Sequence, residues 1–199
     1  MVLERLTRCQ VAVRYAIGVE NIDVNVATDL GIVVAIITGY CVEAVADHCA
    51  GLLLTCARRL VEYGCSVHRG EWSYVTIRSI HRLRGQLVGF IGFGTIARRV
   101  AARLRGFGLL LEEALVCALQ QGQTAGAALD LVAQEPPTAD NPLLRCGSVI
   151  ITPHTAAVSE ESRQAARHCV CDAVMAVMSR QWLPFVIKHG ITPRFPLAS

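Results

Sequence analysis

The sequence lacks the features that mark several large classes of protein. Its longest apolar runs, such as residues 31–37, are much shorter than the roughly 18 residues of a membrane-spanning helix, and its first ten residues contain no apolar signal core. Charged residues make up only 18% of the chain and hydrophobic residues 53%, which is not the composition of a disordered protein. We therefore expect a folded cytoplasmic protein with no membrane partner and with one or two domains in its 199 residues.

Lysine is almost absent, because 18 of the 19 basic residues are arginine, and the formal net charge is only +3. Arginines nevertheless gather in one part of the chain. They could form a nucleic-acid patch or the solvated face of a helix. We favour the solvated face and expect no nucleic-acid partner. The clustered arginines are Arg78, Arg82, Arg84, Arg98, Arg99, Arg103 and Arg105.

Pairs with the Cys-x-x-Cys spacing are also missing, although the chain has nine cysteines. His168, Cys169 and Cys171 lie too close together in a helical segment to converge on one metal ion. We predict no metal site and interpret the cysteines as reduced thiols, most of them buried.

Apolar segments of strand length alternate with helical segments along the chain. This order predicts an α/β fold with a parallel sheet. The expected strands are residues 10–17, 32–37, 86–91, 125–131 and 149–151, and the expected helices are residues 42–63, 95–107, 109–122 and 159–181, the last of them capped by Ser159.

A glycine motif follows the expected strand at residues 86–91 and opens the next helix. Gly92 would allow a tight turn, Gly94 would let the backbone approach a pyrophosphate, and Ala97 would pack the helix on the strand. The N-terminus of the helix would hold the phosphate charge. The motif predicts a site for NAD or NADP, with cofactor contacts from Gly92, Phe93, Gly94, Thr95 and Ile96.

An acidic residue that holds the adenosine ribose is expected about 20 residues after the first glycine. Counting from Gly92 leads to Glu112, and residues 109–111 could be the stub of the strand that would present it. In the other interpretation, which we favour, Glu112 opens the helix that ends at Gly122, because acids suit a first helical turn.

Six stretches together resemble the D-2-hydroxyacid dehydrogenase family, which includes phosphoglycerate, glyoxylate and hydroxypyruvate reductases and related corepressors. They occur in family order and are residues 13–34, 38–60, 70–72, 83–101, 112–144 and 149–156. The resemblance implies an incomplete Rossmann-like parallel sheet with a partial flavodoxin-like substrate lobe. It divides the chain into a partial substrate lobe (1–42), a shortened NAD-binding lobe (43–155) and a C-terminal helix and tail that return to the substrate lobe (156–199).

The resemblance also implies that parts of the family pattern are missing. The opening elements before residue 10 are almost absent. Gly108 is followed directly by the segment around Glu112, where the family has about two further strand–helix units. In the family, the lost stretch carries the ribose acid, residues of the adenine pocket and the catalytic arginine.

Family chemistry uses a histidine, a glutamate and an arginine to interconvert small 2-hydroxy and 2-keto acids. By motif match the histidine is His154 and the glutamate is Glu135, which keeps the imidazole protonated. Arg105 is a weak match for the arginine and could instead be a charge at a helix end. Asp130 is a cofactor-binding candidate with a structural role as the alternative. The backbone of Ala16, Ile17 and Gly18 would meet the substrate carboxylate.

Three functional readings follow. The first is an NAD(P)-dependent 2-hydroxyacid dehydrogenase with impaired activity, and we also expect a homodimer, because the apolar segment 42–63 matches a family helix at a dimer interface. The second is a non-catalytic dimerisation or corepressor-like module that keeps part of a nucleotide pocket. The third is a fragment without function.

Overall fold

The structure, a computed structural model, divides into two compact units that we describe separately. The terminal unit comprises Met1–Cys41 and Ser159–Ser199, and the central unit comprises Val42–Val158. The structure describes residues 2–73, 80–90, 93–112, 127–132, 134–145, 149–183, 185–187, 191–195 and 197. The assignment of the units to a substrate lobe and an NAD-binding lobe stays a prediction.

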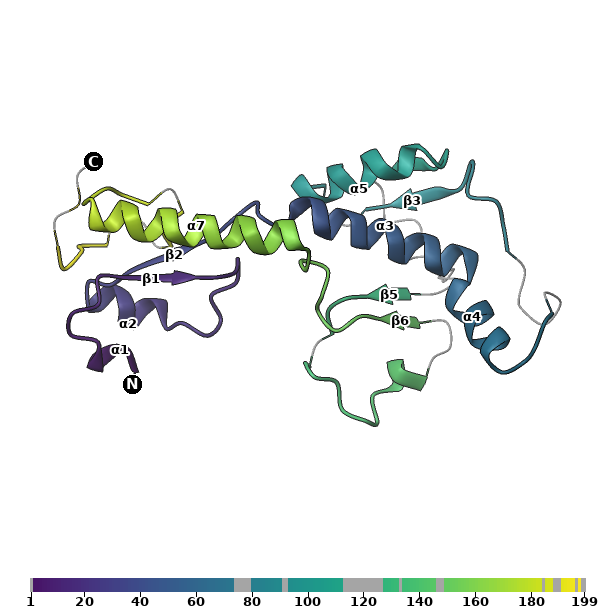
Figure 1. The fold of residues 1–199 in the computed structure, drawn as a ribbon, viewed down its shortest axis with the longest axis horizontal. Helices are drawn as coiled ribbons and strands as arrows, with labels where there is room; N and C mark the ends of the chain where they lie inside the picture. Colours follow the sequence, from purple (N-terminus) through teal and green to yellow (C-terminus); the bar gives the residue numbers. More distant parts are fainter. Residues whose placement is uncertain are drawn as a thin grey trace. The chain divides into compact units, whose positions relative to one another are not determined.

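Helices and short strands alternate along the chain (Figure 1). The helices are α1 (Val2–Arg5), α2 (Val24–Asp29), α3 (Val42–Arg58), α4 (Leu60–His68), α5 (Thr95–Arg105) and α7 (Glu160–Met178), with a 3-10 helix η1 (Pro142–Arg145). The strands are β1 (Val11–Arg14), β2 (Val33–Ile36), β3 (Leu87–Gly89), β4 (Leu110–Glu112), β5 (Ala127–Leu129) and β6 (Val149–Ile151).

In the terminal unit, a parallel pair of strands is buried on both faces. β1 pairs with β2 from Val11↔Val33 to Arg14↔Ile36. Alternate residues of a strand point to opposite faces, so Val33 packs toward α7 while Val34 packs toward α2. Figure 1 shows α7 and α2 on opposite sides of this pair. Two covered faces explain why residues 32–37 read as a continuous apolar run.

Helix α7, which packs on this pair, has well-defined ends. The Ser159 hydroxyl accepts a hydrogen bond from the Ser162 amide at 2.9 Å and caps α7, as the sequence predicts. α7 closes with Arg180 in the left-handed region, at φ 58°. The Arg180 amide then reaches the Val177 carbonyl, and the Gln181 amide reaches the Ala176 carbonyl, which is the hydrogen-bond pattern of a Schellman motif.

The C-terminal tail adds to the edge of β2. The Ile36 amide bonds the Phe185 carbonyl, and the Ile187 amide bonds the Val34 carbonyl, at 3.2 and 2.9 Å. Further along, the Arg194 guanidinium donates to the carbonyls of Leu30, Leu6 and Thr7. The tail therefore fastens both ends of the terminal unit to one another.

The central unit contains two further parallel pairs. β3 pairs with β4 from Leu87↔Leu110 to Gly89↔Glu112, and β5 pairs with β6 from Ala127↔Val149 to Leu129↔Ile151. The α/β class with parallel strands is confirmed. Within the described residues the strands form separate two-stranded parallel sheets.

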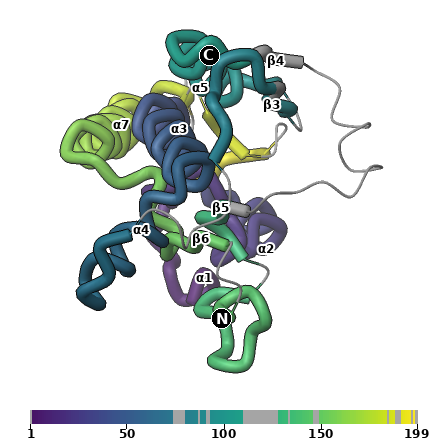
Figure 2. Tube along the Cα trace, turned by 90° about the vertical axis from the view of Figure 1, so that its right-hand side faces the viewer, coloured from purple at the N-terminus to yellow at the C-terminus, as the bar shows by residue number. Residues whose placement is uncertain are grey.

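Helices α3 and α5 pack against each other to form the main core of the central unit, and both views place them side by side (Figures 1 and 2). Ala46 and Ala50 on α3 meet Val100 and Leu104 on α5, and Leu104 is fully buried. The expected helix 95–107 ends earlier in the structure, because α5 stops at Arg105 and Phe107 lies beyond its end and is exposed.

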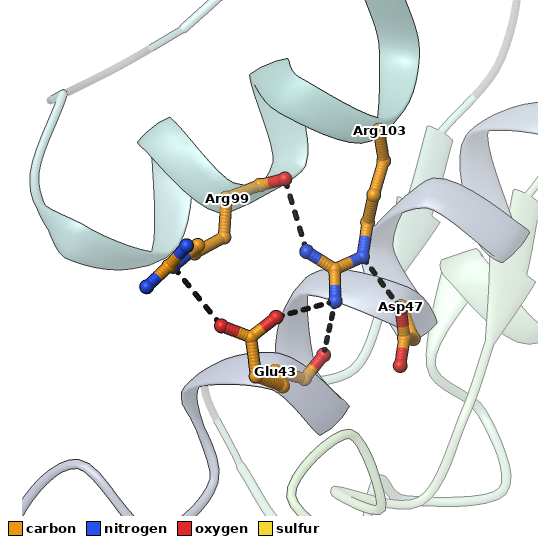
Figure 3. Close-up of polar contacts among 4 residues, drawn as sticks. All are labelled: Glu43, Asp47, Arg99 and Arg103. Carbon is orange, nitrogen blue, oxygen red and sulfur yellow. Dashed lines mark hydrogen bonds and ion pairs between the residues drawn. The ribbon is translucent and has the colours of Figure 1, made fainter. Parts of the chain in front are cut away.

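An ion-pair cluster lines the edge of the same helix contact. Glu43 on α3 lies between Arg99 and Arg103 of α5, at 3.0 and 2.7 Å, and Arg103 also contacts Asp47 at 2.5 Å (Figure 3). These pairs occupy two of the clustered arginines, which supports the solvated-face interpretation over a nucleic-acid patch.

Two expected elements differ in the structure. The predicted helix 42–63 is split into α3 and α4, because Arg59 adopts a left-handed conformation with φ 51°. Glu112 does not open a helix, since it is the last residue of β4. The rest of the expected helix that ends at Gly122 lies outside the described residues, as do positions 125 and 126 of the expected strand. No helix among the described residues is long and apolar enough to cross a membrane.

Candidate active site

Two side chains from the motif matches meet just beyond the carboxyl ends of β5 and β6. The Nδ1 atom of His154 lies 2.9 Å from the Oε2 atom of Glu135. His154 follows β6 and Glu135 follows β5, and carboxyl ends of parallel strands meet at the edge where α/β proteins bind ligands. Because a carboxylate only accepts hydrogen bonds, Nδ1 carries a proton and Nε2 is the nitrogen left to face a substrate.

The Glu135 carboxylate is held in its charged form. The hydrogen bond from His154 and then the hydrogen bond from the Val132 amide, at 3.1 Å, lower the pKa of Glu135 below its usual value. The charged carboxylate accepts the hydrogen bond from Nδ1 and so fixes the orientation of the imidazole ring.

Asp130 holds the loop that carries His154. Its Oδ1 atom accepts from the Thr155 amide and its Oδ2 atom from the Ala156 amide, both at 2.9 Å. Its backbone carbonyl accepts from the His154 amide at 3.0 Å. These contacts support the structural alternative for Asp130, and a direct cofactor contact stays a prediction.

The same network keeps Asp130 ionised. Partial burial acts to raise the pKa of Asp130, but the Thr152 hydroxyl, at 2.5 Å from Oδ1, and the two loop amides outweigh it and lower the pKa. Charge-assisted hydrogen bonds of this kind are about twice as strong as neutral ones.

Two residues that the sequence analysis did not single out complete this network. His48 on α3 places its Nε2 atom 3.0 Å from the Oγ1 atom of Thr152 and 3.6 Å from Oδ1 of Asp130. Two signals were available in the sequence: His48 is a polar residue in an apolar helical segment, and Thr152 directly follows a strand.

The described part of the glycine motif fits one half of a dinucleotide site. Gly94 caps α5, and a Cβ at this position would meet no atom within 4 Å, so the backbone is open to a bound group. The first amides of a helix such as α5 lack intrahelical partners and suit a pyrophosphate. Thr95 is exposed here, whereas Ile96 packs into the α3–α5 core and Phe93 stacks edge-on against Phe90. Gly92 lies outside the described residues.

Other candidate residues fall in different places. Glu112 ends β4 opposite Gly89 of β3, at the carboxyl end where the ribose acid is expected. Arg105 is the exposed last residue of α5, which matches the helix-end interpretation. Ala16 and Ile17 lie in a bend after β1 in the terminal unit, and Gly18 follows the bend, where Arg14 donates to the Gly18 carbonyl at 3.2 Å.

Comparison with known proteins decides the family. Residues 1–188 match the family model for the catalytic domain of D-isomer specific 2-hydroxyacid dehydrogenases. The chain belongs to this family. It is therefore an oxidoreductase by family, as the motifs predict.

Relatives agree with this assignment. A glyoxylate reductase of Korarchaeum cryptofilum is 28% identical, with 96% of this chain and 79% of the relative aligned. A D-3-phosphoglycerate dehydrogenase of Methanocaldococcus jannaschii is also 28% identical, over 97% of this chain and 50% of the relative.

Solved structures share the fold. A Thermus thermophilus protein superposes with a TM-score of 0.81 at 21% identity, covering 94% of this chain and 81% of its own. The NADPH-dependent glyoxylate/hydroxypyruvate reductase of Sinorhizobium meliloti, solved with NADP and malonate, gives 0.77 at 23% identity, covering 98% and 83%.

The alignment lengths agree with an internal shortening. The alignment to the Korarchaeum cryptofilum relative spans 263 positions and includes 96% of this chain. Because 96% of 199 residues is about 191, roughly 70 of these 263 positions hold no residue of this chain. They lie inside the aligned span, so the chain lacks internal segments that this relative has.

Proposed function

We propose that the chain binds NAD or NADP at the start of α5 and interconverts a small 2-hydroxy acid and its 2-keto acid at His154. The contact between His154 and Glu135 carries the proposal, since it forms the acid–base pair that this chemistry needs. The cofactor would be held by the amides of Gly94, Thr95 and Ile96, and it supplies or accepts a hydride.

The proton is handled by this chain's own residues. In reduction, the carbonyl carbon of the keto acid gains the hydride and the carbonyl oxygen gains the proton from Nε2 of His154. The Glu135 carboxylate stabilises the imidazolium before the transfer and keeps the ring oriented after it. In oxidation, neutral His154 takes the hydroxyl proton at the same atom.

We further propose that turnover is low. Within the described ranges, the arginine that would grip the substrate carboxylate has no clear counterpart, since Arg105 ends a helix and is exposed. A charge-assisted hydrogen bond is worth about 1.5–3 kcal/mol, and 1.4 kcal/mol is a factor of ten. Its loss alone should slow the reaction by about tenfold to a hundredfold, and the shortened cofactor lobe adds to this.

The test combines calorimetric titration with NADH and NADPH and a spectrophotometric assay of glyoxylate and hydroxypyruvate reduction. We expect cofactor binding and a turnover well below the roughly 10 per second of an ordinary enzyme. His154→Asn should abolish turnover and leave cofactor binding unchanged. Binding without any turnover would instead favour the nucleotide-sensing module, and absence of binding to both cofactors would overturn the proposal.

Turnover at an ordinary enzyme rate would mean that some residue replaces the missing arginine. Arg105→Ala then separates two possibilities. Loss of activity would assign the carboxylate contact to Arg105, whereas unchanged activity would leave it as a helix-end charge. Arg145→Ala, at the end of η1, is a matched control for the loss of one arginine.

We also propose a homodimer. Apolar side chains that a monomer would be expected to bury are exposed along α4. Leu60, Val61 and Val67 are each about half exposed. α4 continues the segment that resembles the dimer-interface helix of the family. An exposed apolar surface of this kind marks an interaction site, and a two-fold symmetric pair would bury it on both copies.

A further inference from the structure

The hydrogen-bond directions around Thr152 can be assigned from chemistry. Its hydroxyl lies 2.5 Å from Oδ1 of Asp130, and a carboxylate can only accept, so the hydroxyl donates its single hydrogen there. The Oγ1 atom must then accept from Nε2 of His48, 3.0 Å away. His48 therefore carries a proton at Nε2, and three side chains form one polarised chain that ends on a charged carboxylate.

This chain of hydrogen bonds ends on a strained backbone. His154 has φ 53°, a left-handed conformation that costs a non-glycine residue of order 1–3 kcal/mol and persists only where surroundings enforce it. Asp130 supplies that enforcement, because its carbonyl binds the His154 amide and its carboxylate binds the next two amides.

His48 matters because its donated hydrogen bond polarises the Thr152 hydroxyl. A hydroxyl that accepts a hydrogen bond is a stronger donor, so the contact from His48 strengthens the bond from Oγ1 to Asp130. Without that donor, Oγ1 loses a partner, and the shortest hydrogen bond of Asp130 is weakened.

We propose that His48 is a positioning residue for His154, acting through Thr152 and Asp130 to fix the loop at residues 152–156. Its value to catalysis rests on the proposed function, but the geometric effect does not. His48 does not contact the reacting atoms in this assignment, and its role is to keep the imidazole of His154 in place beside Glu135.

The experiment uses nuclear magnetic resonance on the full ¹⁵N-labelled chain and needs no turnover. Amide exchange of Thr155 and Ala156 and the imidazole ¹⁵N shifts of His154 are measured in wild type, His48→Leu and His48→Gln. In His48→Leu we expect both amides to exchange about five- to tenfold faster, the factor for one lost hydrogen bond, and the His154 shifts to move.

The conservative variant separates positioning from packing. Glutamine keeps an N–H donor, so His48→Gln should restore exchange rates and His154 shifts close to wild type. His168→Leu, which makes the same substitution at an exposed site on α7, should leave both measurements unchanged. Wild-type His48 should show the Nε2–H form in its two-bond ¹⁵N correlations.

Several outcomes would overturn the proposal. These are unchanged Thr155, Ala156 and His154 signals in His48→Leu, an equal change in the leucine and glutamine variants, or a wild-type His48 protonated only at Nδ1. If His48→Leu does not fold, Thr152→Val tests the same link and must give the same faster exchange. Failure of the proposed enzyme activity would leave these signals unaffected, so the two proposals are tested separately.

Discussion

At the scale of single residues, the carboxylate of Asp130 holds the loop that carries His154. It accepts hydrogen bonds from a threonine hydroxyl and from two loop amides. Burial acts to raise the pKa of Asp130, but these hydrogen bonds outweigh burial and lower the pKa. The contact between Glu135 and His154 was predictable, because each residue sits in a recognisable local motif. The support beneath it was not, because His48 is 104 residues from Thr152 and only tertiary folding brings them together.

We expect Asp130→Asn to destabilise the chain by about 1.5–3 kcal/mol at pH 7, the range for hydrogen bonds to a charged group. The lowered pKa values of Asp130 and Glu135 mean that the folded state binds protons less readily than the unfolded state. Their stabilisation is complete above the unfolded pKa values of about 4 and is lost as the pH falls below them.

The difference in stability between wild type and Asp130→Asn should therefore shrink as the pH falls below about 4. Urea unfolding at pH 7, 5, 4 and 3 measures it. Asp140→Asn provides a comparison in the exposed loop before η1. A difference that stays constant from pH 7 to 3 would show that the Asp130 charge is not involved.

Cysteine reactivity offers a second test at this scale. Burial, followed by the nearby negative charge of Asp130, raises the pKa of the Cys49 thiol, while Cys65 is exposed. Since the thiolate is the reactive form, iodoacetamide at pH 8 should modify Cys65 well before Cys49. Peptide mapping by mass spectrometry measures both rates. The two rates should become similar in 8 M urea, and Asp130→Asn should accelerate the reaction of Cys49 in the folded chain.

At the scale of elements, strands and helices could be predicted where their apolar patterns are unambiguous. The buried face of α5 is an example, because Ile96, Val100 and Leu104 recur at the four-residue spacing of one helix face. The break between α3 and α4 could not be predicted, because no glycine or proline marks Arg59 and the apolar pattern continues past it. Glu112 was misassigned because acids suit a first helical turn, whereas pairing of β4 with β3 decides its conformation.

The α3–α5 contact allows apolar and ionic contributions to be compared within one interface. Leu104→Ala should cost about 2–5 kcal/mol, because it removes buried methyl groups and leaves a cavity. Arg103→Met should cost about 1 kcal/mol or less, because its partners Glu43 and Asp47 are mostly exposed to water.

Urea unfolding in low salt and in 0.5 M NaCl separates these contributions. Salt should reduce the effect of Arg103→Met and leave that of Leu104→Ala unchanged. If Arg103→Met proved as costly as Leu104→Ala in both buffers, the ion-pair cluster would hold the helices together more than their apolar core.

At the scale of the whole molecule, exposed apolar surface predicts self-association. Size-exclusion chromatography with light scattering at micromolar concentration should give twice the chain mass of 21.5 kDa. Leu60→Glu, which places a charge in the exposed apolar surface of α4, should shift the protein toward the monomer. His68→Gln, at an exposed position on the same helix, is the matched control. A clean wild-type monomer would contradict the dimer.

The left-handed backbone of His154 determines which residues are most stable at this position. Glycine and asparagine adopt that conformation more readily than histidine does. In a library of all substitutions at position 154, sorted only for the yield of folded protein, glycine and asparagine should both rank above histidine. Glycine should likewise rank above arginine in such a library at position 180, after α7. If histidine instead ranked first, the Glu135 contact would outweigh the strain. If glycine and asparagine rank first as expected, selection for stability alone would replace His154. The presence of histidine would then be evidence that its chemistry was required in the past.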